Sequence, residues 1–147
     1  MIFKSKLEPV LRIRKNTEKQ RAMELGVAIS AEQALEIQHQ NAVVRSIEAE
    51  SKKLEVPQGT PAGTWLVLNE IVARHIDAIE EAEEEIEVAA DNTEEKREQF
   101  IEAKGDCSVV ERRLQRQRAD YQLEVAREQQ KEEDERAINF WRGAKAS

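Results

Sequence analysis

From Trp65 onward, apolar side chains return at every seventh residue for eight heptad steps. With Trp65 as heptad position a, the nine residues at that position are Trp65, Val72, Ile79, Ile86, Thr93, Phe100, Cys107, Leu114 and Tyr121. All except Thr93 are apolar or aromatic. Of the eight residues at position d, five are apolar, namely Leu68, Ala82, Ala89, Ala103 and Val110. The other three are His75, Lys96 and Gln117. A strict seven-residue repeat predicts a left-handed coiled coil, because its seam stays turned toward a partner helix. We therefore expect one helix over about 61–141, continuous through Gly105 at outer position f, with a hinge at 105–108 as the alternative.

The segment 55–61 interrupts this helical pattern. Two prolines and a glycine within it cannot continue a helix, whereas Thr60 suits the N-cap of a second helix that begins at Pro61. Upstream, Ser5 and Glu8 have the spacing of a capping box and predict a first helix from about residue 5, or one turn later because of Pro9. We expect a single domain, 1–147, made of a helix over about 5–54, a turn at 55–61, a helix over about 61–141 and a short tail, 142–147.

The first helix carries a less regular apolar stripe. Four polar residues, Arg14, Arg21, Glu32 and His39, interrupt a stripe of Leu7, Leu11, Leu25, Ala28, Leu35, Ala42 and Ala49. A second face carries Ile37, Val44, Ile47 and Leu54. The short turn favours folding the second helix back antiparallel on the first, with residue i opposite about 118 − i. The fold class predicted is therefore all-α, a long two-helix antiparallel coiled-coil hairpin whose second helix outruns the first after about residue 115.

Composition agrees with this fold and narrows the class of protein. The chain is 36% charged, has a net charge of -7, and contains only 3 Pro, 5 Gly and 4% aromatic residues, which disfavours sandwiches, barrels and βαβ enzymes. No apolar run approaches the roughly 18 residues of a membrane span, and the charged start 1–15 does not resemble a signal peptide. A single cysteine suits a reducing cytoplasm, and the acidic balance argues against nucleic-acid binding.

No catalytic or cofactor motif is present, so we expect no enzyme activity, no cofactor and no metal. Glu36 and His39 have the E-x-x-H spacing of a di-iron ligand pair, but such a site needs a second copy, and His75 has Val72 three residues before it. His39 and His75 are better explained as polar residues of the seam. Cys107, at position a, is better explained as a small buried residue than as a redox group.

Charge is distributed unevenly along the chain. Residues 1–22 hold seven basic and two acidic side chains, residues 70–102 hold thirteen acidic and three basic ones, and 112–118 is a second basic cluster. In an antiparallel hairpin the two basic stretches lie at the same end. They are either ordinary solvated faces or a basic surface that is attracted to an acidic protein ring.

The C-terminal part of the second helix is expected to lack a partner from the first. It carries an aromatic pair, Phe140 and Trp141, beside Ala137 and Ile138. Exposed aromatic side chains on an uncovered helix are typical of a docking anchor. The alternative is a disordered tail with two incidental aromatic residues.

Several of these residues resemble the FliJ family, the small coiled-coil proteins of the flagellar type III export apparatus. The resemblance spans the chain and rests on Phe3, Leu7, the stretch 10–14, Trp65 and, above all, the Q-K-x-x-D-E pattern at 130–135. Glu133 departs from the apolar residue that the family often has there. The resemblance implies a rotary-ATPase-like stalk that inserts its terminal end into the hexameric flagellar export ATPase, touches the membrane protein of the export gate and helps recycle export chaperones.

This resemblance predicts a non-enzymatic role in flagellum assembly and motility. The protein is expected to be cytoplasmic and peripherally associated with the cell membrane, without direct insertion into it and without a nucleic-acid partner. The equivalent stalk of a virulence type III secretion system and a general coiled-coil scaffold or chaperone are the alternatives. The expected partner-binding residues are Arg12, Arg14, Arg112, Arg113, Arg116, Gln130, Lys131, Asp134, Glu135, Phe140 and Trp141.

Overall fold

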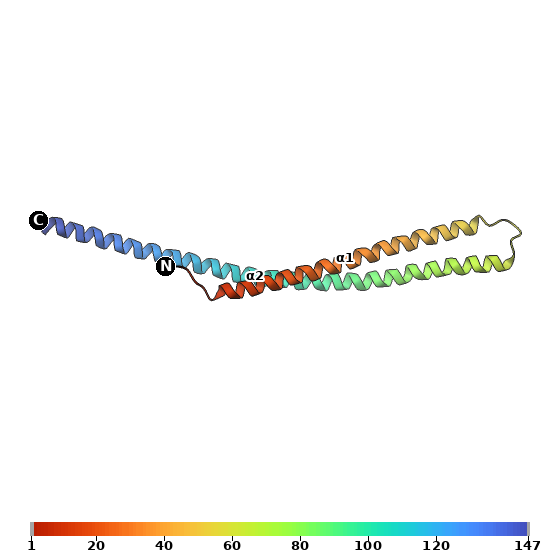
Figure 1. Ribbon diagram of the computed structural model, residues 1–147, viewed down its shortest axis with the longest axis horizontal. Coiled ribbons are helices and arrows are strands. Elements are labelled where there is room, and N and C mark those ends of the chain that lie inside the picture. Colours follow the sequence, from red (N-terminus) through yellow and green to blue (C-terminus); the bar gives the residue numbers. More distant parts are fainter. Residues whose placement is uncertain (1, 147) are drawn as a thin grey trace. The chain divides into compact units, whose positions relative to one another are not determined.

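The computed structural model describes residues 2–146 and contains two long helices, α1 (Leu7–Leu54) and α2 (Ala62–Ala146) (Figure 1). No strand occurs within 2–146. The chain divides into two compact units. One consists of residues 19–101 and is called the turn unit; the other combines residues up to 18 with those from 102 onward and is called the terminal unit. Within each unit α1 and α2 run antiparallel, which confirms the predicted all-α hairpin.

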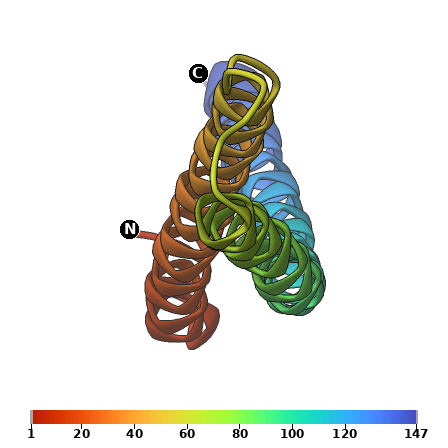
Figure 2. The same cartoon turned by 90° about the vertical axis from the view of Figure 1, so that its right-hand side faces the viewer.

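The helix boundaries follow from local chemistry. The Ser5 hydroxyl accepts a hydrogen bond from the Leu7 backbone N–H at 3.1 Å, so Ser5 caps α1. The turn contains Gly59 with φ of 87°, a left-handed conformation that glycine adopts without steric cost. Figure 2 shows this turn (yellow) from its own end, joining α1 to α2. Thr60 does not act as the predicted N-cap, because its hydroxyl donates to the Pro57 carbonyl and α2 begins at Ala62.

The seam of the turn unit is rich in small and polar side chains. Ala28 and Thr93 are buried, and the Thr93 hydroxyl is satisfied by donating to the Ala89 carbonyl at 2.9 Å. Glu24 lies 3.1 Å from Arg21 and 3.8 Å from Lys96, measured between charged N and O atoms. Glu24 therefore neutralises a basic residue of its own helix, Arg21, and one of α2, Lys96.

The most buried seam lies in the terminal unit. Four of its α2 residues are buried at successive a and d positions: Ala103, Cys107, Val110 and Leu114. The ring of Phe3 packs on Tyr121 with centroids 5.4 Å apart, so the chain before α1 extends the cover along α2. α2 passes through Gly105 as unbroken α-helix. It continues to Ala146, beyond the expected end near residue 141, because no proline stops it.

The two helices pair further along α2 than the 118 − i rule places them. Arg14 contacts Asp106, and Glu8 contacts Arg118, where the rule would bring residues 104 and 110. The rule assumes a symmetric turn about residue 59, whereas the contacts come from long side chains that reach along the partner helix. Cover by the N-terminal segment consequently reaches Tyr121 rather than ending near residue 115.

Candidate partner-binding surface

All the predicted partner-binding residues lie in the terminal unit, and all are exposed. α1 supplies two of them and α2 the remainder: Arg12, Arg14, Arg112, Arg113, Arg116, Gln130, Lys131, Asp134, Glu135, Phe140 and Trp141. They form two groups on α2, one beside the first turns of α1 and one beyond them. The unit thus presents a basic surface and an uncovered helix.

The basic surface consists of residues 4–15 and 112–118, which contain nine basic side chains and one acidic one. Arg14 forms an ion pair with Asp106 at 3.3 Å, and Arg118 forms one with Glu8 at 3.6 Å. These two arginines therefore contribute to pairing α1 with α2. Exposed ion pairs of this kind stabilise a protein by at most about 1 kcal/mol each.

Most arginines of the basic surface have no internal partner. Among residues 2–146, no carboxylate pairs with Arg12, Arg112, Arg113 or Arg116. Their guanidinium groups remain available for carboxylates of another molecule, which they bind with two parallel hydrogen bonds. Lys4 and Lys6 are exposed and likewise unpaired within that range, and residue-by-residue prediction missed them although the net positive charge of 1–22 includes them.

The uncovered helix is residues 126–145, every one of which is exposed. Gln130 donates a hydrogen bond from its amide to the Asp134 carboxylate at 3.1 Å, one turn apart, which supports the helix locally. Phe140 is 81% and Trp141 61% exposed, and the Lys145 ammonium lies 4.2 Å from the Trp141 ring centroid. Large apolar side chains that are this exposed contribute little to folding and are typical of an interaction site.

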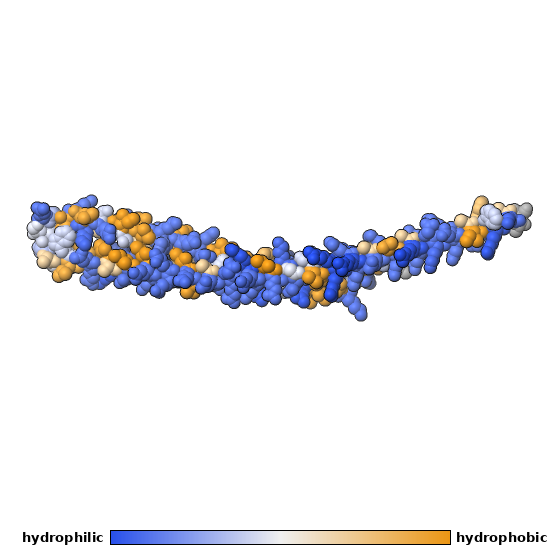
Figure 3. Space-filling view, turned by 180° about the vertical axis from the view of Figure 1, so that it is seen from behind, coloured by the Kyte–Doolittle hydropathy of each residue, from blue (hydrophilic) through white to orange (hydrophobic). Residues whose placement is uncertain are grey.

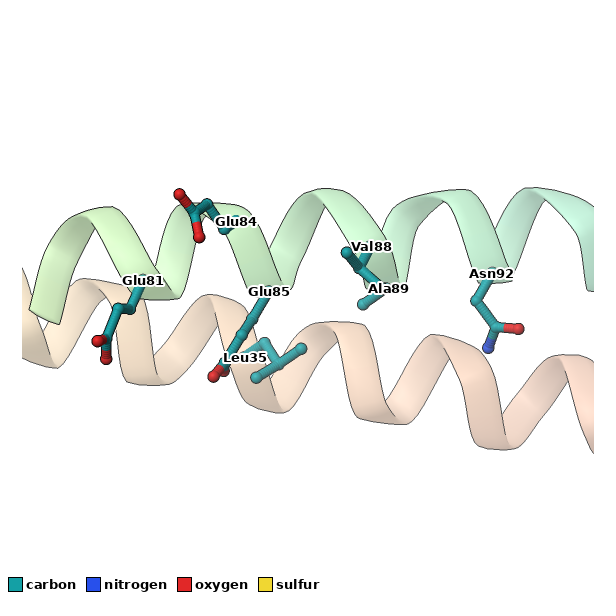
Figure 4. Close-up of a pocket in the computed structure, with 7 residues that line it drawn as sticks. All are labelled: Leu35, Glu81, Glu84, Glu85, Val88, Ala89 and Asn92. Carbon is teal, nitrogen blue, oxygen red and sulfur yellow. The ribbon is translucent and has the colours of Figure 1, made fainter.

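A shallow groove of about 600 Å³ lies in the turn unit (Figure 4). Leu35 of α1 and Ala89 of α2 are part of its apolar lining, while Glu81 and Glu85 extend from α2 toward α1 (Figure 4). Glu84 points away from α1 in the same view. The polar side chains that line the groove are three carboxylates, Glu81, Glu84 and Glu85, and one amide, Asn92.

His39 and Cys107 both lie at the seam between the helices, half-buried and buried respectively. His39 contacts Glu83 across the seam at 3.2 Å, rather than joining Glu36 in a ligand pair. No group of three potential metal-ligating side chains occurs among the described residues. Cys107 is only 3% exposed, and its thiol lies 3.9 Å from a Glu111 carboxylate oxygen. Burial raises the pKa of this thiol above its ordinary value of 9.0, and a hydrogen bond to Glu18 and the charge of Glu111 add to the rise.

We therefore expect Cys107 to be nearly inert in the folded protein. At a pH of about 8, its alkylation by iodoacetamide should be at least about tenfold slower than in urea, because the thiolate is the reactive form. The folded state also holds the thiol proton more tightly than the unfolded chain does. The free energy of unfolding should consequently decrease as pH rises through and above the ordinary thiol pKa, and not below it. A Ser51→Cys variant, with an exposed site on α1, supplies a fast-reacting control; equal rates at both cysteines would contradict this assignment.

No helix within residues 2–146 is long and apolar enough to cross a bilayer. The fold is thus that of a two-helix coiled-coil hairpin with exposed charged surfaces. Comparison with known protein families then identifies the chain. The family model described as "Flagellar FliJ protein" matches residues 3–146, so the chain belongs to the FliJ family. This is a non-catalytic family of the flagellar protein export apparatus, so the chain is a component of flagellar assembly and export. No curated protein and no solved structure matches the chain.

Proposed function

We propose that this protein acts as a stalk of the export apparatus, with 1–147 working as a single hairpin domain that binds the hexameric flagellar export ATPase. The unpaired arginines of the basic surface are the observation that carries this proposal. A surface with nine basic side chains and one acidic one, in a chain of net charge -7, favours an acidic partner. A stalk works through long helices and surfaces that bind other proteins, and it needs no catalytic group. The two long helices and the exposed charged surfaces of this hairpin suit that role.

The uncovered helix supports a second set of contacts. We propose that residues 126–145 bind the membrane protein of the export gate and the export chaperones, with Phe140 and Trp141 as the apolar anchors. An exposed helix with apolar side chains can place them in a groove of another protein. The protein would then work in the cytoplasm, held at the membrane face by its partners and not by insertion.

Reversing the charge of the basic surface should weaken binding to the ATPase. The double variant Arg112→Glu, Arg116→Glu is expected to raise the Kd about tenfold or more, mostly through slower association at low salt. Neither arginine is paired within the described residues, so folding should be unaffected. Surface plasmon resonance with the purified ATPase, repeated over a series of salt concentrations, measures both effects.

A matched control changes charge equally in the turn unit. Arg74 and Arg97 pair only with neighbours on α2, Glu70 and Glu94, so Arg74→Glu, Arg97→Glu alters net charge by the same amount elsewhere. The control should bind nearly as the unmodified protein does. An unchanged Kd for the Arg112, Arg116 variant, or an equal loss in both variants, would reject docking through the basic surface.

A further inference from the structure

The outward face of α1 in the turn unit carries no charge over a long stretch. Heptad positions b, c and f point away from α2, and in a solvated coiled coil they are normally charged or polar. Between Lys19 and Glu48 these positions hold twelve uncharged residues in succession: Gln20, Met23, Gly26, Val27, Ser30, Gln33, Ala34, Ile37, Gln40, Asn41, Val44 and Ile47. We call these residues the neutral strip. In a chain that is 36% charged, such a strip is unlike an ordinary solvated surface.

Every residue of the neutral strip is exposed. Five of its members are large and apolar, and two of these, Met23 at 73% and Val27 at 70% exposure, have little cover from α2. Figure 3 shows apolar side chains (orange) on the outside of the part of the hairpin near the interhelical turn. The main seam of α1 lies on its other side, where Ala28 and Ser46 are buried. α1 is therefore apolar on two faces, of which the fold uses one.

The outward face of α2 in the same unit has the opposite character. Its b, c and f positions between 70 and 98 are dominated by acidic side chains: Glu70, Asp77, Glu80, Glu81, Glu84, Glu87, Asp91, Glu94, Glu95 and Glu98. Two copies of the chain repel each other through such faces. The neutral strip is thus where two turn units can meet without like-charge repulsion.

The two ends of the neutral strip indicate the relative orientation of two turn units that pack on each other. Lys19 stands at one end and Glu48 at the other; both are exposed, and neither forms an ion pair within residues 2–146. We propose that the neutral strip is a self-association surface on which a second copy of this chain packs antiparallel. Lys19 of each copy then faces Glu48 of the other, twice about one two-fold axis. A parallel arrangement would instead place like charges together.

The same register matches the side chains in between. With Lys19 opposite Glu48 the pairing sums to about 67, which places the two-fold axis between Gln33 and Ala34. Met23 then faces Val44 of the other copy, and the small Ser30 faces Ile37. Met23 and Val44 thus make an apolar contact, and the small side chain of Ser30 leaves room for Ile37, which allows the two helices to approach closely.

The size of the neutral strip sets the strength of this contact. Its twelve residues are fewer than the roughly 20–30 that each partner contributes to a standard protein–protein interface. The dimer is therefore weak and dissociates on dilution. The neutral strip shares no residue with the basic surface, so substitutions in it test self-association separately from ATPase binding.

Analytical ultracentrifugation of the full chain over a concentration series tests self-association, and a charge exchange tests the register. Lys19→Glu and Glu48→Lys each set two pairs of like charges against each other, and each should raise the dimer Kd about tenfold. Combining both substitutions restores opposite charges and should return the Kd to that of the unmodified chain. A chain that stays monomeric at every concentration, or a double variant as weak as the single ones, overturns the proposal.

Cysteine cross-linking tests the face itself. Ala34→Cys places a thiol beside the proposed axis, so oxidation should give a disulfide-linked dimer. Glu84→Cys places an equally exposed thiol on the acidic face of α2 and should remain monomeric, as should the unmodified chain with its buried Cys107. Equal cross-linking at both introduced sites, or none at Ala34→Cys, would show that the neutral strip is not in contact with a second copy.

Discussion

A chain truncated after Val125 is expected to abolish flagellin export and swimming while leaving the hairpin folded. Val125 is half-buried, and every residue from 126 to 145 is exposed. Removing the uncovered helix therefore deletes almost no seam contact. The thermal unfolding of the truncated protein, followed by circular dichroism at 222 nm, should shift by only a few degrees.

The loss of function follows from what the uncovered helix presents. It carries the Gln130–Glu135 stretch and the exposed pair of Phe140 and Trp141. If residues 126–145 form the contact with the gate and the chaperones, no other part of the chain replaces them. Swimming in soft agar and the amount of flagellin in the culture medium, measured in a strain whose own gene is deleted, report the effect.

Two controls keep this result interpretable. The full-length gene should restore swimming, and a chain truncated after Arg142, which keeps both aromatic residues, should restore most of it. Immunoblotting must show equal amounts of each protein in the cells. Normal export by the chain truncated after Val125 would contradict the assignment of the uncovered helix as a working surface.

The position of the seam could be predicted from the sequence because the heptad repeat assigns a phase to the residues of α2 from Trp65 to Tyr121. His75 and Lys96 occupy d positions in this phase, and both are half-buried although polar. Thr93, the exception among the a positions, is buried and bonds its own helix. The strict period thus identified the seam even where the residue type alone would have suggested solvent.

Contacts between the helices could not be predicted in the same way. They depend on the offset of α1 along α2, and a shift of one turn changes which charges meet. Arg14 and Arg116 both belong to the predicted basic surface, yet Arg14 is paired with Asp106 and Arg116 has no partner among the described residues. Which arginines remain available to another protein is therefore decided by the register.

The second apolar face of α1 shows another kind of difference. The spacing of these residues predicts a separate face, and all four are exposed: Ile37, Val44, Ile47 and Leu54. Their spacing shows that they lie on one side of α1. The absence of charge over the whole neutral strip indicates an unpartnered surface only once the residues that point away from α2 are known. A structural register was needed to separate solvated positions from unpartnered ones.

Placing a charge in the seam of the terminal unit should have the largest effect on stability. Leu114 is 4% exposed at position a, and Leu114→Asp is expected to lower the free energy of unfolding by about 3–5 kcal/mol. The loss combines the transfer energy of the leucine side chain, the cavity it leaves and the burial of an unpaired carboxylate. For a narrow two-helix seam this is a large fraction of the total stability.

The functional consequence should follow the structural one. The basic surface takes its arginines from both α1 and α2, so separating the helices in the terminal unit disperses the charges that attract an acidic partner. Leu114→Asp should therefore also weaken binding to the export ATPase, although Leu114 itself is covered. Urea unfolding followed by circular dichroism gives the first quantity and surface plasmon resonance the second.

Leu123→Asp provides the matched control, because Leu123 lies on the same helix, is 55% exposed and undergoes the same change of charge. Its free energy of unfolding should change by less than about 0.5 kcal/mol. If both variants unfold alike, Leu114 does not carry the seam. If Leu114→Asp unfolds readily but binds the ATPase with an unchanged Kd, the two halves of the basic surface do not need to be held together, and one helix alone must supply the contact.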